Sequence, residues 1–159
     1  MLLQQVIRKP APLQGAYEHQ LIAVPVDPSD PDLKEWKQLP GTFLPAPPAD
    51  MDVAGWRDPF VLEKPSKTNP YWYVMVGSGI KHESGSALVY RSKNLKSGWE
   101  YVGPLCESNI STMWECPIMA KLTTASPHVD TSSSNANSSL QRHMFCVSPY
   151  YCEIGRAHV

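Results

Sequence analysis

The feature that most constrains the fold is a series of short apolar and aromatic segments separated by turn residues. Between residues 71 and 103, YWYVMVGSG, SALVYRS and GWEYVG follow one another, and GSGIKHESGS joins the first two as a hairpin loop. Four more segments of this kind are HQLIAVPV (19–26), FVLE (60–63), MWECPIMAKL (113–122) and HMFCVS (143–148). The most helix-like stretch, DPDLKEW (30–36), is long enough for two turns at most. We therefore expect an all-β fold.

Composition is typical of one globular domain and excludes several classes of partner. The 159 residues include 14 basic and 15 acidic ones, and this balance offers no electrostatic basis for binding nucleic acid or an anionic membrane. No apolar run approaches the roughly 20 residues of a membrane span. The four cysteines form no C-x-x-C pair and the five histidines lack ligand spacing, so we expect no metal site. Sequons at Asn109 and Asn137 permit glycosylation.

A weak internal repeat suggests how the strands are grouped. The segment from Asp32 to Trp36 (DLKEW) resembles the segment from Asn94 to Trp99 (NLKSGW), and each follows a strand signal. An acid flanked by Trp and Pro comes about twenty residues later in each copy, in WRDP and WECP. Asp58 and Glu115 are 57 positions apart, a spacing that suits one four-stranded blade of a β-propeller. Both carboxylates would then lie on first strands and point into the central channel.

Each acid has a structural and a functional interpretation. Asp-Pro is an ordinary turn dipeptide, and Arg57 could be the salt-bridge partner of Asp58. Glu115 lies between Trp114 and Cys116 in an apolar strand, where a glutamate rarely occurs without a partner or a function. Matching places in two repeats favour a shared site for the two acids.

Several motifs, taken together, resemble glycoside hydrolase family 32, the invertase-like β-fructofuranosidases. They are WRDPF, YWYVMVGSGIK with ALVYRS and GWEYVGPL, and MWECP, and the resemblance covers the chain from Ala16 to Leu122. It implies part of a five-bladed β-propeller, roughly blades two to four, incomplete at both ends. Residues 1–55 would end one blade, residues 56–112 would form a complete blade, and residues 113–152 would begin the next, including a Ser-rich loop.

The last seven residues, EIGRAHV, can be read from an in-frame translation of a common sequencing adapter. We therefore expect residues 153–159 to be an adapter-derived artefact and exclude them from the fold prediction.

The resemblance also implies a chemistry: retaining hydrolysis of terminal β-D-fructofuranosyl bonds in sucrose or fructans, without cofactor or metal. Glu115, in the Glu-Cys motif, matches the general acid/base of such a mechanism. Asp58, in the Arg-Asp-Pro motif, matches the acid that grips fructose hydroxyls and stabilises the transition state. Arg57 would orient the sugar, so all three residues are expected to bind substrate. An extracellular or vacuolar location is expected for the complete protein.

The chain departs from the family pattern in two places. The family's nucleophile, an Asp in a W-M-N-D-P-N-G-type motif, has no match here, because the Asp-Pro pairs at residues 27–28 and 30–31 lie in a polar turn. We therefore expect the chain by itself to be inactive. Ile118 stands where many members have an acidic or polar residue.

Several matters stay open from the sequence alone. Trp56 and Trp114 could wall the pocket, although packing in the core is the favoured interpretation, and Cys116 could tune Glu115 or be a small core residue. A fructosyltransferase, inulinase or levanase would carry the same acids. A noncatalytic carbohydrate-binding propeller, or a propeller that is a general interaction module, is the alternative outside enzymes. The sequence determines neither the substrate chain length nor the oligomeric state.

Overall fold

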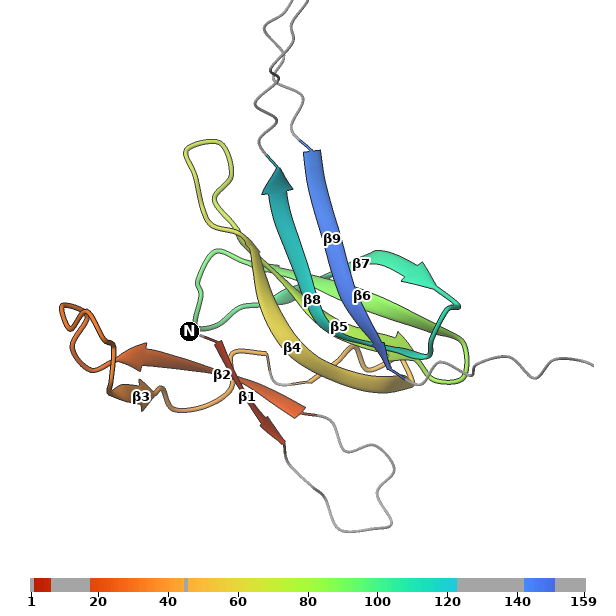
Figure 1. The fold of residues 1–159 in the computed structure, drawn as a ribbon, viewed down its shortest axis with the longest axis horizontal. Helices are drawn as coiled ribbons and strands as arrows, with labels where there is room; N and C mark the ends of the chain where they lie inside the picture. Colours follow the sequence, from red (N-terminus) through yellow and green to blue (C-terminus); the bar gives the residue numbers. More distant parts are fainter. Residues whose placement is uncertain (1, 7–17, 45, 123–141, 151–159) are drawn as a thin grey trace, which may run out of the picture.

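A computed structural model of the protein describes residues 2–6, 18–44, 46–122 and 142–150. These residues form antiparallel strands and turns, with no helix among them (Figure 1). The first sheet contains β1 (Leu2–Val6), β2 (Glu18–Pro25) and β3 (Trp36–Gln38). The second contains β4 (Val53–Glu63), β5 (Trp72–Ile80), β6 (Ser84–Ser92) and β7 (Glu100–Ser108) in that spatial order. The third pairs β8 (Met113–Leu122) with β9 (Arg142–Tyr150).

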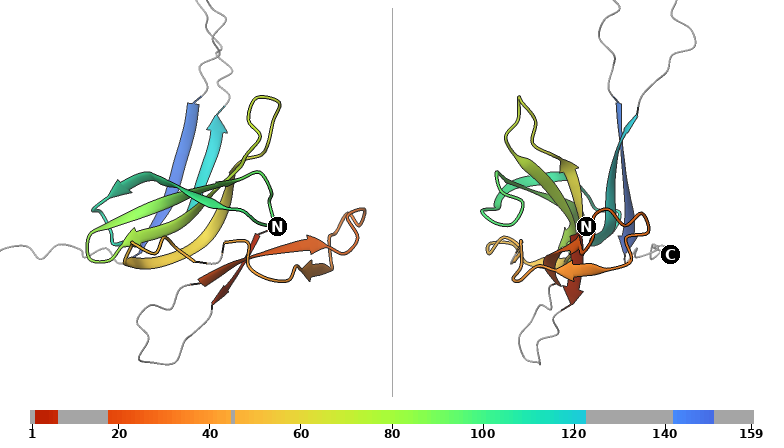
Figure 2. Two further views of the ribbon diagram at one scale, coloured as in Figure 1. Left: turned by 180° about the vertical axis from the view of Figure 1, so that it is seen from behind. Right: turned by 90° about the vertical axis from the view of Figure 1, so that its left-hand side faces the viewer.

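The four-stranded sheet is a twisted meander that packs against a neighbouring sheet on each side. Its first strand, β4, contacts β1 and β2 of the first sheet as well as β8 of the third. Figure 2 shows β8 and β9 (cyan and blue) standing beside this sheet, while the first sheet (red to orange) lies below it. A sheet buried on both faces needs apolar or small residues at successive positions, which explains the unbroken run WYVMV in β5.

The main hydrophobic core fills the space between the first sheet and the four-stranded sheet. Its buried members come from both sheets and from the segment that joins them: Ile22, Phe43, Leu44, Trp56, Val74, Val76, Leu88 and Tyr90. The Phe43 and Trp99 rings meet edge to face, 5.6 Å apart. This core holds β4 against β2 and so brings residues of the two strands together.

Most strand segments are where the sequence predicts them, and two predictions are wrong. The segment DPDLKEW is not a helix. It makes one turn at residues 30–33, in which Asp30 Oδ1 accepts from the Asp32 amide (3.0 Å) and Leu33 has a φ of 45°, and its last residue begins β3. The predicted hairpin loop GSGIKHESGS is mostly strand, since β5 continues to Ile80 and β6 begins at Ser84. The Ser-rich loop lies outside the described residues except for its last residue, and residues 153–159 lie outside them entirely.

The weak repeat has a structural counterpart in the turns that precede two outer strands. Trp36 donates its indole N–H to the Leu33 carbonyl (2.7 Å), and Trp99 donates its indole N–H to the Leu95 carbonyl (3.2 Å). The first turn connects β2 to β3 and the second connects β6 to β7. We infer that β1, β2 and β3 correspond to β5, β6 and β7 of the four-stranded sheet.

Candidate active site

The Arg-Asp-Pro motif forms a β-bulge in the middle of β4. Between Arg57 and Phe60 the register of β4 against β5 shifts by one residue, which places Asp58 and Pro59 in the bulge. Proline is tolerated at such a position because its missing N–H is not needed for the strand pairing. Asp58 has a φ of 57°, a left-handed conformation that is uncommon for a residue other than glycine.

The Glu-Cys-Pro motif forms the same bulge in β8. Here the register against β9 shifts between Glu115 and Ile118, so Cys116 and Pro117 occupy the bulge, and Cys116 has a φ of 48°. The bulge redirects the side chains beside it and locally increases the twist of the strand. Both motifs therefore use one local backbone geometry, on the two strands that Figure 1 shows running next to each other.

The two acids do not occupy matching places in this repeat, contrary to the expectation from sequence. Bulge alignment pairs Arg57 with Glu115 and Asp58 with Cys116, so the acids are offset by one residue. The paired positions are also in contact. Arg57 Nη1 donates to Glu115 Oε1 at 2.9 Å, and the Cys116 amide donates to Asp58 Oδ2 at 2.8 Å. The offset thus brings both carboxylates to one place, from neighbouring strands.

Arg57 connects three sheets rather than serving only as a neighbour of Asp58. Its Nη1 meets Glu115 on β8, and its Nε lies 3.1 Å from Oε2 of Glu18 on β2. The Nε–Glu18 contact is an ion pair without the alignment of a hydrogen bond. About a third of the Arg57 side chain remains exposed (30%), compared with 25% for Glu115, so both groups are accessible to a ligand.

Glu18 is the residue of this cluster that sequence reasoning missed. It begins β2 and is 7% exposed. Burial raises the pKa of the Glu18 carboxyl; Arg57 opposes this effect, while the nearby carboxylates of Asp58 and Glu115 add to it. The sequence held only a weak signal, because His19 and Gln20 separate Glu18 from the apolar run that begins at Leu21.

Small residues in β5 and β6 allow β8 to carry Glu115 close to Arg57. A Cβ at Gly77 would lie 2.5 Å from the Trp114 carbonyl oxygen, and one at Gly79 would overlap the Thr112 carbonyl. A Cβ at Gly85 would overlap the Trp114 indole. These glycines lie toward the ends of β5 and β6 that the hairpin turn joins, and their lack of side chains lets the backbone of β8 and of the residue before it approach the sheet.

The structure decides between the alternatives for the flanking residues. Trp56 and Trp114 are buried, and Trp56 donates to the Tyr90 hydroxyl (3.1 Å), so both rings pack in the interior as favoured. Cys116 is exposed, which excludes its interpretation as a core residue. Ile118 is also half-exposed, immediately after the bulge.

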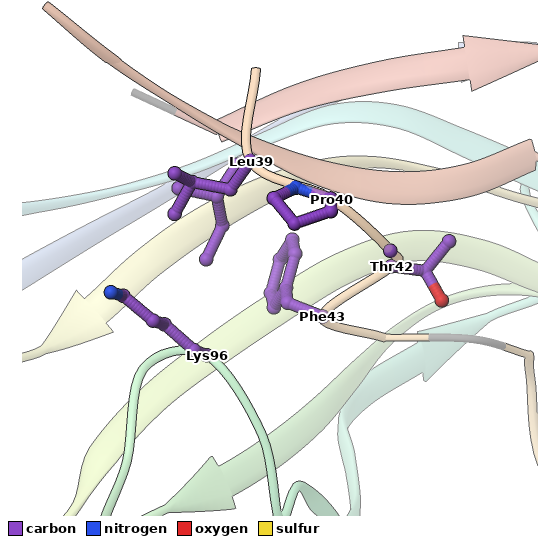
Figure 3. Close-up of a pocket in the computed structure, with 7 residues that line it drawn as sticks. Leu39, Pro40, Thr42, Phe43 and Lys96 are labelled. Atoms are coloured by element: carbon purple, nitrogen blue, oxygen red, sulfur yellow. The ribbon is translucent and has the colours of Figure 1, made fainter. Parts of the chain in front are cut away.

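Other chemical features of the described residues lie away from this cluster or are absent. A pocket of about 190 Å³ is lined by Leu39, Pro40, Phe43 and Lys96 among others, and contains none of the acids (Figure 3). Within the part of the chain that the structure describes, no group of three His, Cys, Asp or Glu side chains is arranged to hold a metal. The same part contains no long apolar helix that could cross a bilayer.

The cluster combines an exposed carboxylate in contact with a cation and a second carboxylate fixed by a backbone amide. Comparison with known proteins identifies the family of the chain. Residues 7–156 match the model of the glycosyl hydrolases family 32 N-terminal domain. The chain belongs to glycoside hydrolase family 32.

Curated relatives of this family 32 chain are plant β-fructofuranosidases. The insoluble isoenzyme CWINV6 of Arabidopsis thaliana is 35% identical over 119 residues, which are 74% of this chain and 21% of the relative. Isoenzyme CWINV1 of the same plant is 36% identical over 134 residues (81% and 22%), and a cell wall isozyme of Zea mays is 36% identical over 104 residues (64% and 17%). The chain therefore spans about a fifth of the length of these relatives.

Solved structures confirm the fold class. Fructan 1-exohydrolase IIa from Cichorium intybus has a TM-score of 0.62 and 24% identity, and the match covers 84% of this chain and 24% of that one. A complex of a variant of that enzyme with 1-kestose gives a TM-score of 0.61 and 23% identity. The family 32 chain is all-β and forms part of a five-bladed β-propeller, as the sequence predicted.

Proposed function

We propose that the complete protein hydrolyses terminal β-D-fructofuranosyl bonds of sucrose or fructans with retention of configuration. The observation that carries this proposal is the convergence of Glu115 and Asp58 from neighbouring strands, linked by Arg57 and by the Cys116 amide. The β-fructofuranosidase names of the relatives support the same bond specificity. Because two relatives, from Zea mays and Pisum sativum, are named cell wall isozymes, we also propose an extracellular location.

In this proposal Glu115 is the general acid/base. In the first step it gives its proton to the leaving-group oxygen while a carboxylate nucleophile bonds to the anomeric carbon and the glycosidic C–O bond breaks. In the second step it takes a proton from the water that displaces the nucleophile. The partial exposure of Glu115 allows it to reach both the leaving oxygen and the water.

Asp58 is proposed to bind fructose hydroxyls and to stabilise the positive charge that develops in the transition state. Its carboxylate is held by the Cys116 amide, and its backbone is held in a left-handed conformation, so its orientation is set before substrate binds. Arg57 is proposed to donate to the sugar as well as to Glu115.

Replacing the two acids in the complete protein tests these roles. We expect Glu115→Gln to lower the rate of sucrose hydrolysis by about 10²- to 10⁴-fold, because no group then protonates the leaving oxygen. An aryl β-D-fructofuranoside with an acidic phenol needs no such proton, so E115Q should lose much less activity on it. D58N should lose activity on both substrates, since charge stabilisation is needed whatever the leaving group. Steady-state rates on the two substrates measure the difference.

The matched control is Glu63→Gln, an exposed carboxylate on the same strand as Asp58. It should leave both rates unchanged. Sucrose hydrolysis at the wild-type rate by E115Q would contradict the proposal. A product assay at high sucrose separates the fructosyltransferase alternative, which would form longer oligosaccharides. Sugar binding without turnover by the complete protein would support the noncatalytic alternative instead.

A further inference from the structure

We propose that Glu18 is a positioning residue for this site: its carboxylate holds the Arg57 guanidinium in the orientation in which Arg57 binds Glu115. The inference rests on the proposed function and extends it to a residue outside both motifs. Glu18 lies on a different sheet from either motif and reaches the acid/base only through Arg57.

The geometry places Arg57 between two carboxylates that use different nitrogens of its guanidinium. Glu18 Oε2 lies 3.1 Å from Nε, close to the stem of the side chain, and Glu115 Oε1 lies 2.9 Å from Nη1. An arginine side chain has several rotatable bonds, and anchoring its Nε removes much of their freedom. The outer nitrogens are then presented to β8 in one orientation.

Neighbouring contacts fix Glu18 itself. The next residue but one, Gln20, is fully buried and donates from Nε2 to the carbonyls of Glu18 (3.2 Å) and Trp56 (3.1 Å). This amide ties the start of β2 to the strand position just before Arg57. The ion pair between Glu18 and Arg57 is therefore built on a rigid backbone connection between the two sheets.

The burial of Glu18 is difficult to explain by stability alone. The carboxylate is 7% exposed, and its raised pKa shows that burial outweighs the attraction of Arg57. A buried ion pair is often no more stabilising than apolar residues of similar size. A charge kept in such a place at a cost in stability is expected where the charge serves a site.

The test compares kcat for sucrose with kcat for an aryl β-D-fructofuranoside that has an acidic phenol, measured on the complete protein. We expect Glu18→Gln to lower kcat for sucrose by about 10- to 100-fold, as for other losses of orientation in an active site. We expect a much smaller loss on the aryl substrate, which needs no proton from Glu115, whereas a purely structural role would lower both rates equally. Glu18→Asp keeps the carboxylate, so it should lose less activity on sucrose than E18Q.

Circular dichroism spectra and thermal melts establish that each variant is folded, and Glu63→Gln serves again as the exposed control. A folded E18Q that keeps the wild-type rate on sucrose, or that loses activity equally on both substrates, would overturn the inference. If E18Q does not fold, E18D decides, because an equal loss on both substrates would overturn the inference in the same way. Failure of the proposed function is a separate outcome, since E115Q and D58N would then keep their activity.

Discussion

The Arg57 guanidinium lies between two carboxylates that are 97 positions apart in the chain, at residues 18 and 115. Its two contacts differ in character. Glu115 is partly exposed and remains accessible to a ligand, whereas Glu18 is buried and faces only protein. Arg57 thus contacts both Glu115, which is suited to proton transfer, and Glu18, which is suited to holding Arg57 in place. The difference in burial is what separates their proposed roles.

The burial of Glu18 makes the stability of the chain depend on pH. A carboxyl whose pKa is raised in the folded state binds its proton more tightly there, so its contribution to stability is present below the ordinary pKa of 4.5 and is lost as pH rises through the raised value. Relative to E18Q, the wild-type chain should therefore lose stability between pH 4.5 and neutrality. If the pKa of a carboxyl differs by one between the folded and unfolded states, the free energy of unfolding changes by about 1.4 kcal/mol across the titration. Urea unfolding of both proteins at pH 4 and pH 7.5 measures this loss, and a stability difference that does not change with pH would contradict the prediction.

At the scale of the strands, local sequence determines some boundaries, and packing between sheets determines others. The strand at residues 113–122 has the bounds that the sequence predicts, because the stretch is mostly apolar and is flanked by polar residues. For the glycines near the end of β5 the sequence predicts a loop, since glycine and serine usually mark turns. They are strand residues because the backbone of β8 occupies the space where their side chains would be. The sequence around these glycines does not reveal that β8 packs against them.

Gly79→Ala should therefore destabilise the chain although alanine is tolerated in most strands. The new Cβ would overlap the carbonyls of Thr112 and Ser84, and both are backbone atoms that cannot move aside easily. We expect a loss of about 1–3 kcal/mol in the free energy of unfolding, as for other overpacked sites. In the complete protein, sucrose hydrolysis should fall with it, because β8 carries Glu115.

Gly41→Asn is the matched control for this substitution. Nothing lies within 4 Å of a Cβ at Gly41, and asparagine tolerates its φ of 77°. Gly41→Asn should lower the free energy of unfolding by only a few tenths of a kcal/mol. Equal melting temperatures for G79A and the wild type would contradict the role assigned to the close approach of β8.

The whole molecule assembles its site from three sheets, and no one sheet contains all of it. Glu18 comes from the first sheet, Arg57 and Asp58 from the second, and Glu115 from the third. Sheets arranged around an axis bring equivalent positions of their first strands together, which is why the Arg57–Glu115 and Asp58–Cys116 contacts both join residues 58 positions apart. The site residues therefore stay together only if the three sheets remain packed against one another.

The chain by itself should not turn over sucrose. It carries the proposed acid/base and the proposed stabilising acid, but no segment matches the family's nucleophile motif. Removing one member of a set of groups that act together costs almost as much as removing all of them, so we expect a loss of several orders of magnitude. Glucose release by residues 1–152, compared with the complete protein under the same conditions, measures this. Ordinary turnover by the chain would show that another carboxylate acts as nucleophile.

The sequence by itself determined the strands, the repeat of a Trp-containing turn, the two proline motifs and the family. These features depend on alternation, turn chemistry and short motifs, all of which are local along the chain. Only the tertiary structure decided that the acids are offset by one residue, that the glycines at residues 77, 79 and 85 lie inside strands, and that Glu18 belongs to the site. Each of these depends on which surfaces meet between sheets, and the free energy of that packing comes from residues far apart in sequence.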